Sequence, residues 1–105
     1  MLAFSDKLLP TIKLTLRETS TNFDDEIKSY IDTCAVDLQN AGILSSFFSS
    51  IAVDPLILQA VRWYCLSNYG LYNADSEKYA KSYASLKATL CTQRKYTEEK
   101  KNAVQ

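Results

Sequence analysis

Apolar residues recur every three or four positions along four stretches of the chain, a spacing that lines one face of an α-helix. The clearest stretch lies between Asn22 and Gly42. Its apolar stripe consists of Phe23, Ile27, Tyr30, Ile31, Cys34 and Leu38. Asn22 is a favourable N-cap, acidic residues fill the first turn, and Gly42 suits the C′ position. Asp25, Asp32 and Gln39 fall on the opposite, polar side. The pattern therefore predicts an amphipathic helix between residues 22 and 42.

A first helix is predicted from Pro10 to Glu18, because proline is favoured in the first turn, where its missing N–H costs no hydrogen bond. One earlier turn, begun by Ser5, is an open alternative. The polar residues 19–22 then form a linker to the next helix.

The third helix is predicted from Pro55 to about Asn68, with Asp54 as its N-cap and Gly70 beyond its end. Its apolar residues occupy nearly every side of the helical projection; they are Leu56, Ile57, Leu58, Ala60, Val61, Trp63, Tyr64, Cys65, Leu66 and Tyr69. A helix that is apolar all round is buried all round. Three neighbouring helices can hardly cover every side, so we expect a partner molecule to cover the rest.

The fourth helix is predicted to begin near Asn73 or Asp75. Its inner stripe is Tyr79, Tyr83, Leu86 and Leu90, and its outward positions are Lys78, Lys81, Ser85 and Thr89. The Lys-, Arg- and Glu-rich residues 92–105 predict a solvated helical extension, or a flexible arm that orders on a partner. Residues 1–91 are accordingly expected to form the helical domain and residues 92–105 its charged C-terminal tail.

The segment between the second and third helices, residues 43–53, alternates apolar residues with serine pairs. It predicts either a short strand or an extra helical turn. Since so short a segment has few ways to bury both Phe47 and Phe48 internally, these rings are expected to face an interface.

The 105 residues include only two glycines and two prolines, too few for an all-β fold, which needs frequent turns. The fold class predicted is therefore all-α: a small four-helix bundle with an apolar inter-helix loop and a charged C-terminal arm.

Candidate chemistry is sparse. The chain has no histidine and no glycine-rich phosphate loop, so we expect a non-enzymatic protein without a cofactor. The Asp24–Glu26 cluster lacks calcium-loop spacing, and a helix N-terminus favours acids in any case, so no metal site is predicted. Cys34, Cys65 and Cys91 come with no CxxC motif, which favours core residues in a reducing compartment.

No apolar run approaches the roughly 20 residues of a membrane span. Residues 1–9 lack the apolar region of a signal peptide. The protein is expected to be made and kept in a cytoplasm, with no membrane partner.

The charges balance at 12 basic and 12 acidic residues, which argues against a protein whose affinity comes from gripping phosphates. Their distribution is uneven: residues 18–54 carry seven acids and one base, whereas residues 55–105 carry eight bases and four acids. Opposite charges on two regions allow copies to attract one another. The resulting hypothesis for a subunit interface comprises Asp25, Asp32, Phe47, Phe48, Arg62, Trp63, Lys78 and Lys81. For Trp63, core and interface positions are equally open, whereas Tyr79 and Tyr83 favour the core.

The order of these features resembles a known family. The motifs are Thr21–Ile27 (TNFDDEI), Leu38–Ile43 (LQNAGI), Asp54–Ile57 (DPLI), Ala60-Val61, Tyr64, Tyr69-Gly70, Tyr83–Lys87 (YASLK) and Leu90. Over about residues 8–91 the chain is similar to the head–tail connector (head-completion, or adaptor) proteins of tailed bacteriophages, which dock beneath the portal.

The resemblance implies a structural subunit of a homo-oligomeric ring, commonly of twelve copies, at the head–tail junction of the virion. Such a ring binds the portal protein above and a stopper or tail-completion protein below, and DNA passes through it without sequence-specific binding. Assembly would take place in the host cytoplasm. The resemblance also implies that the C-terminal segment reaches the portal, through Arg94, Lys95, Tyr96, Lys100 and Lys101. Two alternatives are a small helical DNA-binding or DNA-packaging accessory protein and a cellular regulatory bundle that binds one partner helix.

Overall fold

The computed structural model describes residues 3–49, 52–69 and 74–98, and this part of the chain is helical with no strand. The helices are α1 (Phe4–Leu16), α2 (Asp24–Asn40), α3 (Pro55–Asn68), α4 (Ser76–Cys91) and the short α5 (Arg94–Thr97), with a 3₁₀ helix at Ser45–Phe48 between α2 and α3. The predicted all-α class is therefore confirmed.

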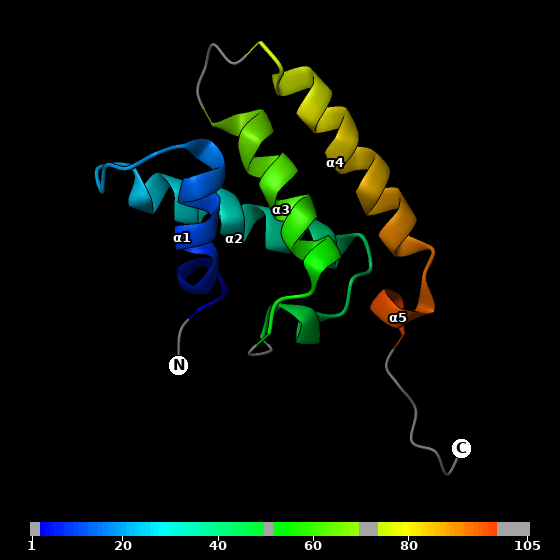
Figure 1. Ribbon diagram of the computed structural model, residues 1–105. Helices are drawn as coiled ribbons and strands as arrows, with labels where there is room; N and C mark the ends of the chain where they lie inside the picture. The colour runs from blue at the N-terminus through cyan, green and yellow to red at the C-terminus, as the bar shows by residue number, and fades with distance from the viewer. Residues whose placement is uncertain (1–2, 50–51, 70–73, 99–105) are drawn as a thin grey trace.

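Helix α3 is the central element of the bundle. It lies between α1 and α4, and α2 crosses behind α1 and α3 (Figure 1). The short α5 folds back at the end of α4, near the start of α3 (Figure 1). This arrangement gives α3 three helical neighbours, which bury much of its apolar circumference.

The core is formed by the periodic apolar residues of all four long helices. Its side chains with at most 3% exposure on these helices are Leu8, Ile12, Ile27, Ile31, Cys34, Leu38, Ile57, Ala60, Val61, Cys65 and Leu90. Because these residues recur at three- and four-residue spacing, each helix brings one continuous stripe to the centre.

Helix α1 begins six residues earlier than predicted, at Phe4 rather than Pro10. Pro10 lies inside the helix on its exposed side, where its ring removes one backbone hydrogen bond. The stripe Phe4, Leu8 and Ile12 is buried in the core, and this burial outweighs the proline's helix-breaking cost of about 3 kcal/mol. The helix therefore extends before Pro10, as the alternative allowed, but its N-cap is Ala3 rather than Ser5 and it ends at Leu16 rather than Glu18.

The two ends of α2 compare differently with the prediction. The predicted N-cap Asn22 is wrong by one residue, because Phe23 occupies that position and no side chain caps the helix. The Asn22 N–H instead donates to Ser20 Oγ in the preceding turn, at 3.0 Å. At the other end Gly42 lies at C′ with φ of +117°, as predicted. The Gly42 and Ile43 N–H groups donate to the carbonyls of Gln39 and Leu38, both at 3.0 Å, which closes a Schellman motif.

The start of α3 is as predicted. Asp54 is the N-cap, and its Oδ1 accepts hydrogen bonds from the N–H groups of Leu56 at 2.9 Å and Ile57 at 3.2 Å. The N-cap of α4 is Asp75, one of the two predicted positions. Asn73 and Gly70 lie outside the described residues.

The expectation that Phe47 and Phe48 have few internal burial sites is wrong. Phe48 packs edge-on against Phe4, with ring centroids 5.1 Å apart, and Phe47 lies 5.0 Å from the ring of Tyr96. The segment forms a helical turn, one of the two predicted alternatives. Both aromatic partners come from parts of the chain that were predicted to lie elsewhere: a turn before Pro10 and the C-terminal tail.

None of the described helices is long and apolar enough to cross a lipid bilayer.

We expect two substitutions in α2 to have very different effects on stability. Ile31 is fully buried, so Ile31→Ala should lower the free energy of unfolding by about 2–5 kcal/mol. Val36 is 55% exposed, so Val36→Ala should change it by less than about 0.5 kcal/mol. Urea unfolding followed by circular dichroism measures both, and equal losses would contradict the assigned orientation of α2.

Candidate functional site

Three tyrosines anchor the C-terminal half of the chain to its acidic segment. The hydroxyl groups of Tyr69, Tyr83 and Tyr96 donate to the carboxylates of Glu18, Asp37 and Asp54 at 2.5, 2.6 and 3.0 Å respectively. Hydrogen bonds to a charged acceptor are stronger than neutral ones. Much of the negative charge in residues 18–54 is therefore used within the fold.

Asp37 joins α2 to α4. Its Oδ2 accepts from the Tyr83 hydroxyl and from Lys87 Nζ, the latter at 3.0 Å. Burial acts to raise the pKa of the Asp37 carboxyl, but the hydrogen bonds from Tyr83 and Lys87 outweigh it, and the pKa is lowered from its ordinary value. The Cys34 thiol donates to the Tyr83 oxygen at 3.8 Å, and burial raises the pKa of that thiol to about 12. Cys34 is thus a neutral core residue.

Asp54 holds three parts of the chain at one point. Besides capping α3, it accepts the Tyr96 hydroxyl and pairs with Lys95 Nζ at 3.5 Å. Burial acts to raise the pKa of the Asp54 carboxyl. The two backbone N–H donors, the Tyr96 hydroxyl and the Lys95 charge outweigh it, so the pKa is lowered from its ordinary value. The Leu44 N–H donates to the Tyr96 carbonyl at 2.8 Å. Helix α5 is therefore fixed to the start of α3 and to the segment before the 3₁₀ helix.

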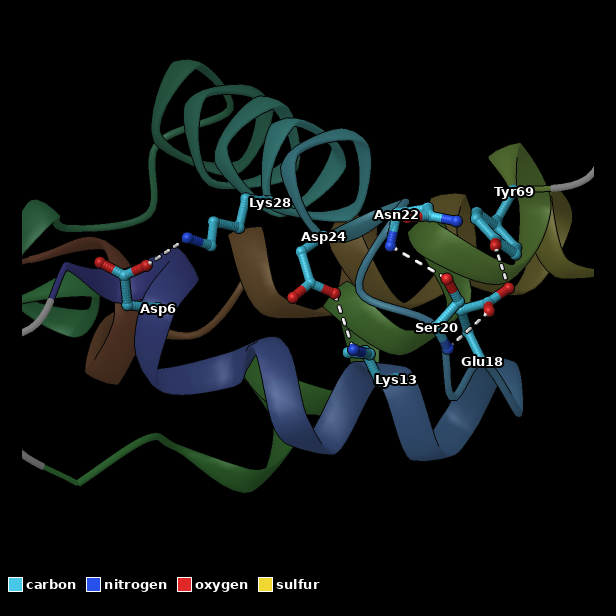
Figure 2. A network of polar contacts seen from close by, with 8 residues as sticks. All are labelled: Asp6, Lys13, Glu18, Ser20, Asn22, Asp24, Lys28 and Tyr69. Atoms are coloured by element: carbon cyan, nitrogen blue, oxygen red, sulfur yellow. Dashed lines mark hydrogen bonds and ion pairs between the residues drawn. The ribbon is translucent and has the colours of Figure 1, made fainter.

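A second network fastens α1 to α2 and to the end of α3 (Figure 2). Two ion pairs cross between α1 and α2: Lys13 with Asp24 at 2.7 Å and Lys28 with Asp6 at 3.0 Å. Glu18, just beyond α1, accepts the Tyr69 hydroxyl and the Ser20 N–H (Figure 2). Both bonds lower the pKa of the Glu18 carboxyl. The hydrogen bond to Glu18, together with burial, raises the pKa of Tyr69 to about 12.

The Asp24–Glu26 cluster does not converge on a common point. Asp24 pairs with Lys13, Glu26 accepts the Tyr30 hydroxyl at 3.3 Å, and Asp25 is exposed. Across residues 3–49, 52–69 and 74–98, no three His, Cys, Asp or Glu side chains are grouped so as to hold a metal ion.

Two acids of the predicted subunit interface remain without a partner. Asp25 and Asp32 are exposed, and neither forms an ion pair or hydrogen bond within the described part of the chain. They are two helical turns apart, and Ser29 and Val36 share their side of α2. We call this exposed surface the α2 face: Asp25, Ser29, Asp32 and Val36. Val36 was not predicted as a surface contact, although it interrupts the polar side of the helical projection.

The predicted residues Trp63 and Lys81 are brought together in a surface groove between α3 and α4. The groove is lined by Trp63, Lys81, Ser82, Ser85, Leu86 and Thr89, and we call it the α3–α4 groove. Trp63 is half-buried, so its ring belongs to both core and surface. Lys81 is exposed and reaches Glu77 at 3.5 Å. Lys78 lies one turn before Ser82 on the same side of α4 and has no partner in the described residues.

The other predicted interface residues lie elsewhere. Arg62 donates to Gln59 within α3, at 3.4 Å. Phe47 and Phe48 pack against rings of the same chain, as described above. The structure therefore groups Trp63, Lys78 and Lys81 but does not place Arg62, Phe47 or Phe48 with them.

The predicted docking arm is divided. The side chains of Arg94 and Lys95 are 89% and 67% exposed, whereas Tyr96 is only 2% exposed and belongs to the core. Lys100 and Lys101 lie outside the described residues. Sequence reasoning missed the burial of Tyr96 because its partners, Phe47 and Asp54, lie more than forty residues away along the chain.

Comparison with models of known protein families shows a similarity over most of the chain. A family model described as "Phage connector protein" matches residues 8–97, a span that contains α2, α3, α4 and α5 in full. No curated protein and no solved structure matches the chain significantly.

We expect acid to destabilise the fold through the three carboxylates that accept tyrosine hydroxyls. Glu18, Asp37 and Asp54 have pKa values lowered by folding, so the unfolded chain binds more protons in acid. Their stabilisation is fully present above the unfolded pKa values of about 4 and is lost as the pH falls through the lower folded values. We expect the free energy of unfolding to be level from pH 6 to 8 and to decline below about pH 4.

Urea unfolding at a series of pH values measures this dependence, and it can be repeated on tyrosine variants. Tyr83→Phe removes a donor to Asp37 and should make the acid decline shallower. Tyr79→Phe is the matched control, because the Tyr79 hydroxyl has no hydrogen-bond partner in the described residues. Identical pH profiles for the two variants would contradict the role of Asp37.

Asp54→Ala should lower the free energy of unfolding by about 2 kcal/mol, because it removes both the helix cap and the acceptor of Tyr96. Asp32→Ala, on the exposed α2 face, is the control and should change it by less than about 0.5 kcal/mol. Tyr96→Phe should lose about 1 kcal/mol, and the double variant less than the sum of the single losses. Strict additivity in denaturant titrations would show that Asp54 and Tyr96 are not coupled.

Proposed function

The chain belongs to the phage head–tail connector protein family, and from this membership we propose that it is an adaptor subunit that assembles as a ring beneath the portal. The observation that carries the proposal is the extent of the family match. It covers residues 8–97 and so includes the tyrosine–carboxylate contacts as well as all of the α2–α5 core. The family is one of structural proteins, and the role proposed for this chain is likewise structural.

The proposed partners lie along the axis of the ring. Portal protein binds on the head side, a stopper or tail-completion protein binds on the tail side, and further copies of the chain, commonly twelve, complete the ring. The subunit belongs to the head–tail junction of the virion and is assembled in the host cytoplasm. The exposed charges of Arg94 and Lys95 support a contact of the C-terminal segment with the portal.

The proposed ring lets DNA pass without gripping it. The chain has no net charge. Three of its lysines, Lys13, Lys28 and Lys87, are held in partly buried ion pairs with carboxylates of the same chain. Because phosphate binding depends on available basic groups, this pairing favours weak contact with a moving duplex.

The direct test mixes the purified chain with portal rings from the same phage and measures the mass of the complexes. The proposal predicts portal particles that carry a ring of added subunits. It also predicts weak DNA binding in a gel-shift titration at low salt. Tight, salt-sensitive DNA binding without portal attachment would instead identify a DNA-binding or packaging accessory protein.

Charge reversal tests the C-terminal arm. Lys100→Glu together with Lys101→Glu should weaken portal attachment at least about tenfold, because like charges then face a surface that accepts basic groups. The matched control, Lys100→Arg with Lys101→Arg, keeps both charges and should attach normally. The urea unfolding transition of the helical domain should be unchanged in both variants. Unchanged attachment of the glutamate variant would exclude these lysines from the docking contact.

A further inference from the structure

The internal ion pairs determine which charges remain available to another molecule. Of the seven acids in residues 18–54, Asp25 and Asp32 are the two without a hydrogen bond or ion pair in the part of the chain described, and both lie on the α2 face. On α4, Lys78 forms no hydrogen bond or ion pair with the described residues through its side chain. Lys81 makes only a solvent-exposed ion pair with Glu77. Such exposed i,i+4 pairs contribute little and are readily exchanged. Arg17 and Arg94 are exposed bases elsewhere on the molecule. The two acids share one helix face, and the two lysines lie in or beside the α3–α4 groove.

The two surfaces also match in apolar character. Val36 is 55% exposed at the end of the α2 face. The half-buried side chains of Trp63 and Leu86 line the α3–α4 groove, and most of its other lining residues are short Ser and Thr side chains. A helix laid into an apolar groove is a common mode of recognition between proteins.

We propose that the α2 face of one copy docks in the α3–α4 groove of the next copy. The contact places Asp25 and Asp32 against Lys78 and Lys81 and seats Val36 on Trp63 and Leu86. This inference rests on the proposed function, because it names the surfaces through which connector subunits meet.

The spacing of the residues is consistent with one register. If α2 lies parallel to the neighbour's α4 with Asp32 beside Lys81, Val36 lies one turn further on, beside the apolar lining of the groove. In this register Lys78 falls between Asp25 and Asp32. Its axial distance is about 4.5 Å from Asp32 and about 6 Å from Asp25, within reach of a lysine side chain.

A second copy is the partner that the charges favour. Both halves of a complementary contact are present on one chain, on separate helices, so each copy can offer its α2 face to one neighbour and its groove to another. The start of α2 and the body of α4 lie at opposite sides of the molecule (Figure 1). A contact between different surfaces is heterologous, and when the rotation closes it produces a ring.

Complementary charge reversal tests the contact. Variant A carries Asp25→Lys and Asp32→Lys, and variant B carries Lys78→Glu and Lys81→Glu. Each alone brings like charges together and should weaken self-association at least about tenfold at low salt. An equimolar mixture should restore assembly, because each altered surface then meets its complement and each unaltered surface does too. Mass measurement across concentration, alone and on portal rings, gives the readout.

Controls separate contact from folding. Lys78→Arg with Lys81→Arg keeps the charge and should assemble as the unaltered chain does. Urea unfolding should show that variants A and B are folded, since all four altered side chains are exposed. Val36→Gln should weaken assembly with little loss of stability, because Val36 is 55% exposed and glutamine is a good helix former. Weakening of assembly by added salt is expected for the unaltered chain.

The outcomes also distinguish the inference from the proposed function. If the unaltered chain loads onto portal rings and variants A and B load equally well, this contact is wrong while the connector function stands. If no portal binding occurs but mixing A with B restores self-association, the contact is right and the connector function is wrong. An unaltered chain that remains monomeric both alone and with portal rings overturns the proposed contact.

Discussion

The central part of the structure depends on the hydrogen bonds that the Asp54 carboxylate accepts. This carboxylate supplies the missing hydrogen bonds at the start of α3, the helix that all the other long helices contact or flank. The same group receives the hydroxyl of Tyr96 and so fixes α5 to the bundle. One acidic side chain thereby connects local helix capping with long-range packing, and its lowered pKa reflects both tasks.

Pairing inside the chain shapes the surface that other molecules meet. Glu18 and Asp37 repeat the arrangement of Asp54, each receiving a tyrosine hydroxyl from far along the sequence. An acidic middle segment and a basic C-terminal region suggest attraction between copies, but five of the seven middle-segment acids are already bonded within one copy. What remains is more specific than a diffuse charge difference. In the described residues it includes an acidic α2 face and the lysines beside the α3–α4 groove, and the proposed assembly contact uses both.

The sequence predicted best what depends on neighbouring residues. Helix α3 and its Asp54 cap, and the Gly42 end of α2, follow from short-range capping and periodicity. The start of α1 was misplaced because tertiary burial of Phe4 overrides the local preference of Pro10. Tyr96 was grouped with an exposed arm because its partners could be identified only in three dimensions. Among the candidate site residues, exposed positions on the polar sides of α2 and α4 were predictable from periodicity, whereas the aromatic residues between elements were not.

The proposed contact is tested most directly by zero-length carboxylate–amine cross-linking of assembled subunits, mixed from isotopically light and heavy preparations. If the α2 face of one copy docks beside the α3–α4 groove of the next, links from Asp25 or Asp32 to Lys78 or Lys81 should join light to heavy chains. The pair Asp37–Lys87, which lies 3.0 Å apart within one chain, should link only peptides of the same isotope and serves as an internal reference. Mixed-isotope links that involve other surfaces, with none between the α2 face and residues 78 and 81, would contradict the account.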